Sequence, residues 1–243
     1  MFSLKANIFS NLEKEILSLQ GFRQPVEEQK TDLGLGSICS SFPRQTFPFA
    51  AVHEFKSANP ESKSATLGFV SCILSRIMKT EGISVWIHSG RTVFPPALTG
   101  FGVAPERIIF INATTEKDSL WITEEALACE GLSAVVAELH EINFISSRKF
   151  QLAVEKSRVT GMLMSSQQKY SVNACTARWE ISQLPSGAPH NLPGVGFPRW
   201  QVKLVKMRNG RPGTWNLEWS KGNFRLLDVP DEMTLVGQKL KVV

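Results

Sequence analysis

The feature that most constrains the fold of this chain is a series of short apolar segments separated by helical patterns. The apolar segments span residues 50–55, 83–88, 107–112, 133–139 and 161–166. Helical patterns lie at 67–82, at about 115–130 and at about 146–159. Strands without regular polar alternation are buried on both faces, which is typical of parallel sheets that helices cover. The order of the segments therefore predicts an α/β domain with a mostly parallel central sheet.

The last third of the chain has a different pattern. Strand-like segments at 177–184, 200–207, 214–219 and 223–227 are separated by loops and turns rich in Gly and Pro. The dipeptides Asn209-Gly210 and Pro212-Gly213 are typical of turns between antiparallel strands. This part predicts an antiparallel meander that extends one edge of the parallel sheet.

The start of the chain predicts an amphipathic helix over residues 1–20. Its apolar stripe consists of Leu4, Ile8, Leu12 and Ile16, which share one helix face. A single helix of this length is marginal in water, so the stripe must pack on something. Two alternatives stay open: packing on the chain's own domain, and packing on a partner or on a second copy of the chain.

Composition sets the remaining boundaries. Residues 21–47 predict a connector, residues 48–228 the folded domain, and residues 229–243 a tail that is either disordered or docks on a partner. The four cysteines form no C-x-x-C pair, so we expect no metal site. Because no apolar run could span a membrane and the N-terminus lacks a signal-peptide pattern, we expect a cytoplasmic protein. The net charge of +5 permits nucleic acid or an acidic protein as partner.

The turn after the first strand is the place where a doubly wound sheet binds phosphate. Here the turn spans residues 57–66 and resembles the Walker loop of the RecA recombinases, G-P-E-S-S-G-K-T-T-L. Asn59 and Ser64 stand where that loop has glycines, and Ala65 stands where it has lysine. Glycine lets the backbone approach phosphate, and lysine offsets phosphate charge, so both losses impair nucleotide binding. The predicted degenerate loop consists of Asn59, Pro60, Glu61, Ser62, Lys63, Ser64, Ala65 and Thr66.

Four positions of this resemblance bear on catalysis. Thr66 keeps the hydroxyl that ligates magnesium in the recombinases, whereas Lys63 lies two positions before their lysine. Gly90 stands at the position of the catalytic glutamate, which leaves no base to activate water. Glu138 stands at the position of the Walker B aspartate, where it either holds a metal through water or is only the polar end of a strand. We therefore expect no ATP hydrolysis and no cofactor.

Several segments together point to a narrower group of proteins. They are N-L-E-K-E-I-L-S-L-Q-G at 11–21, G-R-T-V-F-P-P-A-L at 90–98, A-V-E-K-S-R-V-T-G at 153–161, P-G-V-G-F-P-R-W at 193–200 and N-G-R-P-G at 209–213. In this combination the chain resembles the ImuA family of RecA-like error-prone repair proteins over about residues 8–227. The resemblance implies a RecA-like fold of the P-loop NTPase type. It also implies a damage-induced protein that acts with an inactive Y-family polymerase homologue (ImuB) and an error-prone replicative-type polymerase, with RecA as a further candidate partner.

The antiparallel meander carries an excess of basic residues, interleaved with tryptophan and phenylalanine. Seven basic side chains stand against one acid, Glu218: Arg199, Lys203, Lys206, Arg208, Arg211, Lys221 and Arg225. Basic residues among aromatic ones are typical of surfaces that bind single-stranded nucleic acid, and such a surface also suits an acidic protein. The alternative is that Trp200 faces the core while Lys203 faces water.

Taken together, these features predict a non-catalytic scaffold of damage-induced, error-prone translesion synthesis. Its expected partners are proteins, with any contact to DNA weak or indirect. Two other functions stay open, a recombinase-like enzyme with weak ATP turnover and a module that binds single-stranded DNA. The absence of a lysine at Ala65 and of a base at Gly90 speaks against the enzyme.

Overall fold

A computed structural model describes most of the chain. The described residues are 33–57, 59–79, 81–90, 93–167, 171–187 and 196–227. The predicted N-terminal helix, with its stripe of Leu4, Ile8, Leu12 and Ile16, and the predicted tail at 229–243 lie outside them. What the sequence indicates about these two segments therefore stays a prediction.

The described strands form one sheet of nine strands in the order β3-β2-β4-β5-β1-β6-β7-β8-β9. Its parallel part consists of β1 (Val52–Lys56), β2 (Ser84–His88), β3 (Ile108–Asn112), β4 (Ala134–Leu139) and β5 (Thr160–Ser165). Strands β1, β4 and β5 are buried along their whole length, as expected for strands that are covered on both faces. The predicted parallel central sheet is confirmed.

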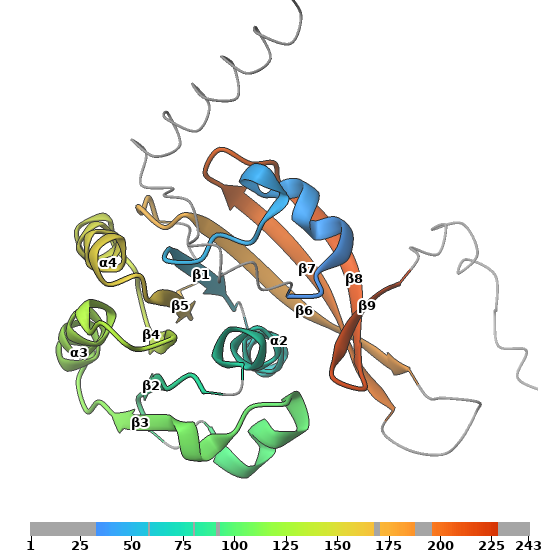
Figure 1. Cartoon of the computed structure of the whole chain (residues 1–243), viewed down its shortest axis with the longest axis horizontal. Coiled ribbons are helices and arrows are strands. Elements are labelled where there is room, and N and C mark those ends of the chain that lie inside the picture. Colours follow the sequence, from blue (N-terminus) through green and yellow to red (C-terminus); the bar gives the residue numbers. More distant parts are fainter. Residues whose placement is uncertain are drawn as a thin grey trace, which may run out of the picture.

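Helices cover both faces of the parallel strands (Figure 1). Helix α2 (Pro60–Met78) lies on one face, while α3 (Glu116–Ala128) and α4 (Phe144–Ser157) lie on the other. Two short 3-10 helices, η4 (Pro95–Phe101) and η5 (Pro105–Arg107), connect β2 to β3. None of the helices in the described ranges is long and apolar enough to cross a membrane.

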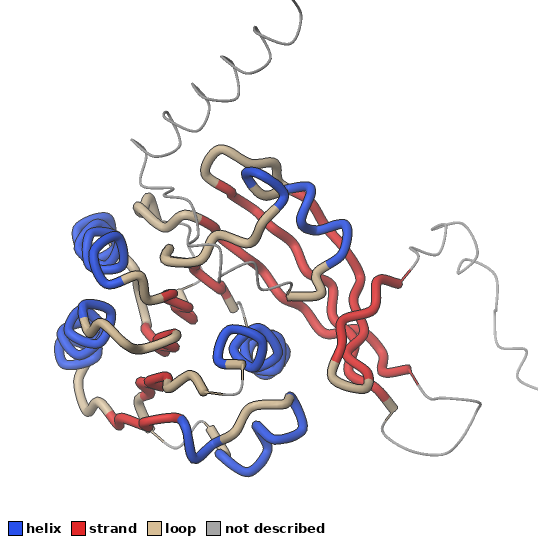
Figure 2. Tube along the Cα trace, in the orientation of Figure 1, coloured by secondary structure: helices blue, strands red, loops and turns tan. Residues whose placement is uncertain are grey.

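The C-terminal strands continue the same sheet beyond β1 (Figure 2). Strand β6 (Ala177–Gly187) runs parallel to β1, and β7 (Phe197–Met207), β8 (Gly213–Ser220) and β9 (Asn223–Leu227) follow as antiparallel neighbours. Trp200 and Val202 are buried on the face that packs against α2. The predicted antiparallel extension is confirmed, and together with the parallel core it gives the expected RecA-like arrangement.

Part of the predicted connector belongs to the folded domain. Residues 33–47 contain the 3-10 helices η2 (Gly36–Ser41) and η3 (Pro43–Gln45), which lie beside the C-terminal strands (Figure 1). Leu35, Ile38 and Phe42 are buried there, and the Phe42 ring packs edge-on against Trp179 at 5.8 Å. These apolar residues follow no regular spacing, so neither a helix nor a strand pattern marks them in the sequence.

Candidate functional site

The turn between β1 and α2 is much shorter than the sequence predicts. Strand β1 ends at Lys56 and α2 begins at Pro60, whereas the sequence pattern predicts the helix at 67–82. Asn59 starts the helix, because its side-chain oxygen accepts a hydrogen bond from the Ser62 backbone N–H at 2.7 Å. Proline at the first helical position favours the same start, because it has no N–H to leave unpaired.

Because α2 starts at Pro60, the backbone of this turn does not have the conformation of a phosphate-binding loop. Residues from Glu61 to Thr66 are helical, and the Lys63 N–H already bonds the Asn59 carbonyl at 2.9 Å. A phosphate cradle needs several N–H groups that converge on one anion, and helical N–H groups beyond the first turn are used within the helix. Ser64, at the second glycine position, is exposed and donates to the Pro60 carbonyl at 3.2 Å.

The two positions that would hold the phosphate and the metal face inward. Ala65 and Thr66 are both buried. The Ser57 hydroxyl donates to the Thr66 hydroxyl at 3.0 Å. The hydroxyl that matches the magnesium ligand of the recombinases therefore takes part in a bond between α2 and the residue after β1. Thr66 therefore acts in packing in this arrangement.

Lys63 and Glu138 meet at this end of the sheet. Lys63 Nζ lies 2.8 Å from Glu138 Oε2, and Trp86 Nε1 donates to Glu138 Oε1 at 3.4 Å. The Glu138 side chain is 6% exposed and that of Lys63 is 39% exposed. A buried carboxylate is costly unless a cation and hydrogen bonds compensate it. The ion pair supplies that compensation from within the chain, at the position that the resemblance to the recombinases assigns to a metal ligand.

The space beside this ion pair is small. A cavity of about 180 Å³ is lined by Ser57, Lys63, Ser89, Glu138, Leu139, His140, Met164, Ser165 and Ser166. Pockets for small-molecule ligands measure about 300–1,000 Å³. Because the cavity is small, the loop is helical and Lys63 is bound to Glu138, the residues present do not fit a nucleoside triphosphate.

The position that the resemblance to the recombinases assigns to the catalytic glutamate carries no side chain. Gly90 follows β2 with φ +82°, and its N–H donates to Asn112 Oδ1 at 3.1 Å. The His88 ring nitrogen Nδ1 bonds the Gly90 carbonyl. This short turn therefore fixes the end of β2 without placing a carboxylate toward α2.

A second polar cluster, which the sequence patterns did not reveal, lies under the loop between β5 and β6. Glu54 on β1 is buried and accepts hydrogen bonds from Arg178 Nε at 2.6 Å, Asn173 Nδ2 at 2.7 Å and Ser165 Oγ at 3.1 Å. Charged residues in the V-H-E-F-K segment of a strand buried on both faces were the available signal.

Basic side chains hold the loop that precedes β6. Arg178 donates to the Ser171 carbonyl at 2.7 Å, Lys206 to that of Asn173 at 3.2 Å, and Arg208 to that of Ala174 at 2.8 Å. Burial lowers the pKa of Lys206, and the nearby charges of Arg178 and Arg208 lower it further. Lys206 and Arg208, which the sequence assigns to the basic meander, therefore also fix this loop.

The seven predicted basic residues do not form one group. Arg199, Lys203, Lys206 and Arg225 lie on one face of the extension, as the strand pairing shows. Arg208 lies directly after β7, and Arg211 and Lys221 lie in the turns that follow β7 and β8. The rings of Trp200 and Trp219 are buried against α2 on the opposite face. The expectation that Trp200 faces the core is confirmed, and these rings are not free to stack on bases.

The sequence of the chain is similar to that of known proteins of one family. No family model matches the chain. It is 32% identical over 198 residues to Protein ImuA of Caulobacter vibrioides strain NA1000 / CB15N, and the match covers 76% of this chain and 81% of that protein. Protein ImuA of Caulobacter vibrioides strain ATCC 19089 / CIP 103742 / CB 15 matches with the same identity and coverage. Since this identity extends over most of both proteins, the chain belongs to the ImuA family.

Proposed function

We propose that this protein is a non-catalytic assembly factor in the error-prone repair of damaged DNA. Membership of the ImuA family implies the repair role. The finer proposal is that the chain brings together an ImuB-type polymerase homologue and an error-prone replicative-type polymerase, with the RecA recombinase as a further candidate. We expect it to act in the cytoplasm and to use no cofactor.

The observation that carries this proposal is the ion pair between Lys63 and Glu138. An enzyme of RecA type needs a cation free to meet the phosphates and a carboxylate free to hold the metal. Here the lysine and the carboxylate that lie nearest to those roles bind each other at 2.8 Å. The helical loop and the missing side chain at Gly90 support the same conclusion. The alternative of weak ATP turnover has no comparable support.

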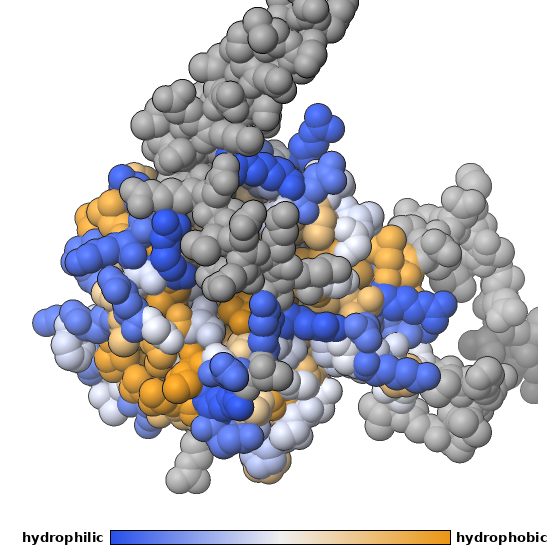
Figure 3. All heavy atoms as spheres, viewed as in Figure 1, coloured by the Kyte–Doolittle hydropathy of each residue, from blue (hydrophilic) through white to orange (hydrophobic). Residues whose placement is uncertain are grey.

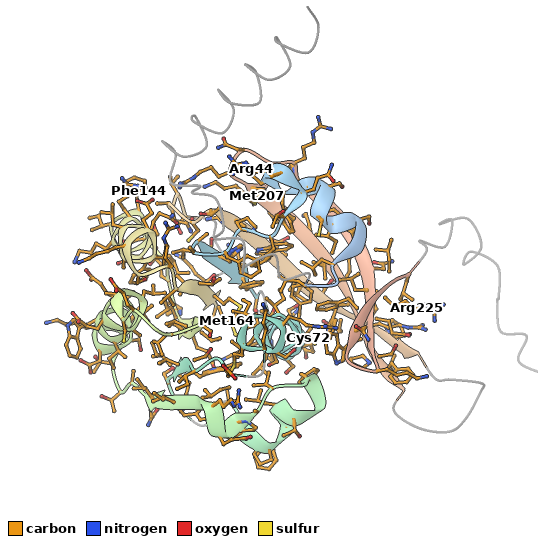
Figure 4. All side chains as sticks on the ribbon, viewed as in Figure 1. Arg44, Cys72, Phe144, Met164, Met207 and Arg225 are labelled. Atoms are coloured by element: carbon orange, nitrogen blue, oxygen red, sulfur yellow. The ribbon has the colours of Figure 1, made fainter. Side chains whose placement is uncertain are left out.

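Exposed apolar side chains support contacts with other proteins. Phe144 and Ile145 at the start of α4 are 55% and 71% exposed, and Val172 in the loop before β6 is 82% exposed. The Ser171 hydroxyl bonds the Ile142 carbonyl at 2.9 Å, which keeps this loop beside the start of α4, where Figure 4 labels Phe144. Figure 3 also shows hydrophobic atoms at the surface between α3 and the edge strand β3, where Ile109 is half exposed.

A reconstitution experiment tests the proposal. The full chain is mixed with the ImuB-type homologue and the error-prone polymerase of the same bacterium, and complexes are separated by size-exclusion chromatography with and without ATP. We expect a complex that forms equally well in both conditions, and no ATP hydrolysis above background. Turnover that Thr66→Ala abolishes, while the control Thr99→Ala at an exposed site preserves it, would contradict the proposal. A complex that forms only with ATP would contradict it as well.

A further inference from the structure

No helix in the described ranges packs on the second face of the C-terminal strands, although the loop at 171–175 covers Arg178 and contacts Lys206 there (Figure 1). Helices α2 and η2 contact these strands from the side of Trp200, Val202 and Leu204. All charged side chains of β6 to β9 lie on the other face, because strand residues alternate between faces and the cross-strand pairs align them. We call this surface the basic face: Arg178, Glu180, Arg199, Lys203, Lys206, Glu218 and Arg225.

Cations exceed carboxylates on the basic face even after its ion pairs are counted. Arg199 Nε lies 2.7 Å from Glu218 Oε2, and Arg225 lies opposite the same Glu218 on the neighbouring strand. Lys203 Nζ lies 3.4 Å from Glu180 Oε2. The five cations and two carboxylates leave a net charge of +3 within these four strands.

One part of the basic face places like charges against each other. Arg178 and Lys206 are direct cross-strand partners, and like charges in such positions destabilise a sheet. Arg208 also lies close enough to lower the pKa of Lys206. Glu54 offsets Arg178 through its 2.6 Å ion pair but leaves the group positive. An anion bound beside Lys206, the exposed member of this pair, would relieve the repulsion.

The other side chains of the basic face distinguish between classes of anionic partner. In strands β6 to β9 the apolar side chains on this face, Leu184, Phe197 and Leu227, are partly buried, and the exposed Leu226 stands opposite the buried Leu217 and so points to the other side. Protein interfaces depend on well-exposed apolar and aromatic anchors, and the described strands present none on this face. Gln201 and Asn216 lie opposite each other on this face, and amides of this kind donate hydrogen bonds to phosphate oxygens.

We propose that the basic face binds the phosphate backbone of a nucleic acid without reading or stacking on its bases. Arg199, Lys203 and Lys206 lie along β7, and a row of cations matches a chain of regularly spaced phosphates (Figure 4 labels Arg225 on β9, which β8 separates from β7). This goes beyond the proposed function, because an assembly factor could act through protein contacts alone.

Fluorescence anisotropy with the full chain tests this proposal, using a labelled oligothymidine and a labelled duplex of equal length between about 50 and 200 mM salt. The variant Lys203→Gln/Lys206→Gln/Arg225→Gln should weaken binding about tenfold or more, and should reduce the slope of log K against log salt by about 2 for the single strand. The matched control Lys117→Gln/Arg148→Gln/Lys156→Gln removes the same charge from α3 and α4, and should change binding by less than about threefold.

A second measurement does not depend on the folding of a variant. Lysine acetylation of the wild-type chain should become slower at Lys203 and Lys206 when oligothymidine is present, and should be unchanged at Lys117 and Lys156. Equal losses in the basic-face variant and in the control would overturn the proposal, as would equal protection of all four lysines. Two further results would also overturn it: preference for the single strand above about a hundredfold, which needs base stacking, and tight binding of polyglutamate with none of DNA. Each of these outcomes leaves the assembly role of the preceding section unaffected.

Discussion

His53 on β1 contacts both the segment before β1, at Phe47 and Pro48, and the C-terminal strands, at Trp179. Its protonation therefore tests the packing between these parts. Its ring is fully buried and stacks on Phe47 at 4.5 Å. Nε2 lies 2.8 Å from the Pro48 carbonyl, and Trp179 Nε1 lies 3.4 Å from Nδ1. A carbonyl only accepts and an indole N–H only donates, so the neutral ring with its proton on Nε2 satisfies both partners. A second proton on Nδ1 would face the Trp179 N–H.

The cost of that second proton fixes the expected pH dependence. Burial lowers the pKa of His53 from 6.5 to about 4, although the bond to Pro48 opposes the shift. As the pH falls through 6.5 the unfolded chain binds a proton that the folded chain refuses, so the free energy of unfolding decreases until the pH reaches about 4. From these two pKa values the decrease between pH 7 and pH 5 is about 2 kcal/mol.

Urea unfolding, followed by tryptophan fluorescence at constant ionic strength, measures this effect. In His53→Gln the amide keeps one donor and one acceptor but does not titrate, so the stability difference between wild type and variant should shrink by about 2 kcal/mol between pH 7 and pH 5. The control His140→Gln changes an exposed ring and should follow the wild-type curve. A difference between wild type and His53→Gln that is the same at both pH values would refute the assignment of a buried, neutral ring.

Two further predictions concern the ion pair and the helical loop. Lys63→Met should lower the free energy of unfolding by about 1–3 kcal/mol in urea titrations at pH 7, because it leaves the Glu138 carboxylate buried without its cation while Lys63 itself is partly solvated. Adding Glu138→Leu should recover most of the loss, and a double variant as unstable as the single one would contradict this explanation. Ser64→Gly/Ala65→Lys should not create an ATPase in a coupled phosphate-release assay, since a missing base at Gly90 costs about 10²–10⁴-fold. Robust turnover would show that another residue supplies the base.

The fold was largely predictable because each element has a local signal. The five parallel strands and the meander follow from apolar runs and from turn dipeptides such as Asn209-Gly210. Helix α2 begins earlier than predicted. The predicted start is late because the resemblance to a Walker loop suggests an irregular turn before the helix. Asn59 followed by Pro60 is itself a helix-start signal, and the structure follows this local signal.

Of the candidate site, only the missing functional groups could be predicted from the sequence. Ala65 and Gly90 are visible in the sequence as missing functional groups, but the partner of Lys63 is not. Glu138 lies 75 residues later, and the contact needs the order of β4, β5 and β1 in the sheet as well as the early start of α2. Long-range pairings of this kind leave no periodic pattern.

Charged residues in buried strands are the signal that deserves more weight in chains of this kind. Glu54 and Glu138 both lie in strands that are buried along their whole length, and each is matched by a cation from another element. A buried carboxylate persists only when its surroundings compensate it, so a carboxylate in an apolar strand segment indicates that a cation or donor from elsewhere in the chain must reach it. In this chain one partner, Lys63, lies in the turn that resembles a Walker loop, and the other, Arg178, lies at the start of the basic face. The two buried carboxylates thus lie at the two places for which we make proposals, the Walker-like turn and the basic face.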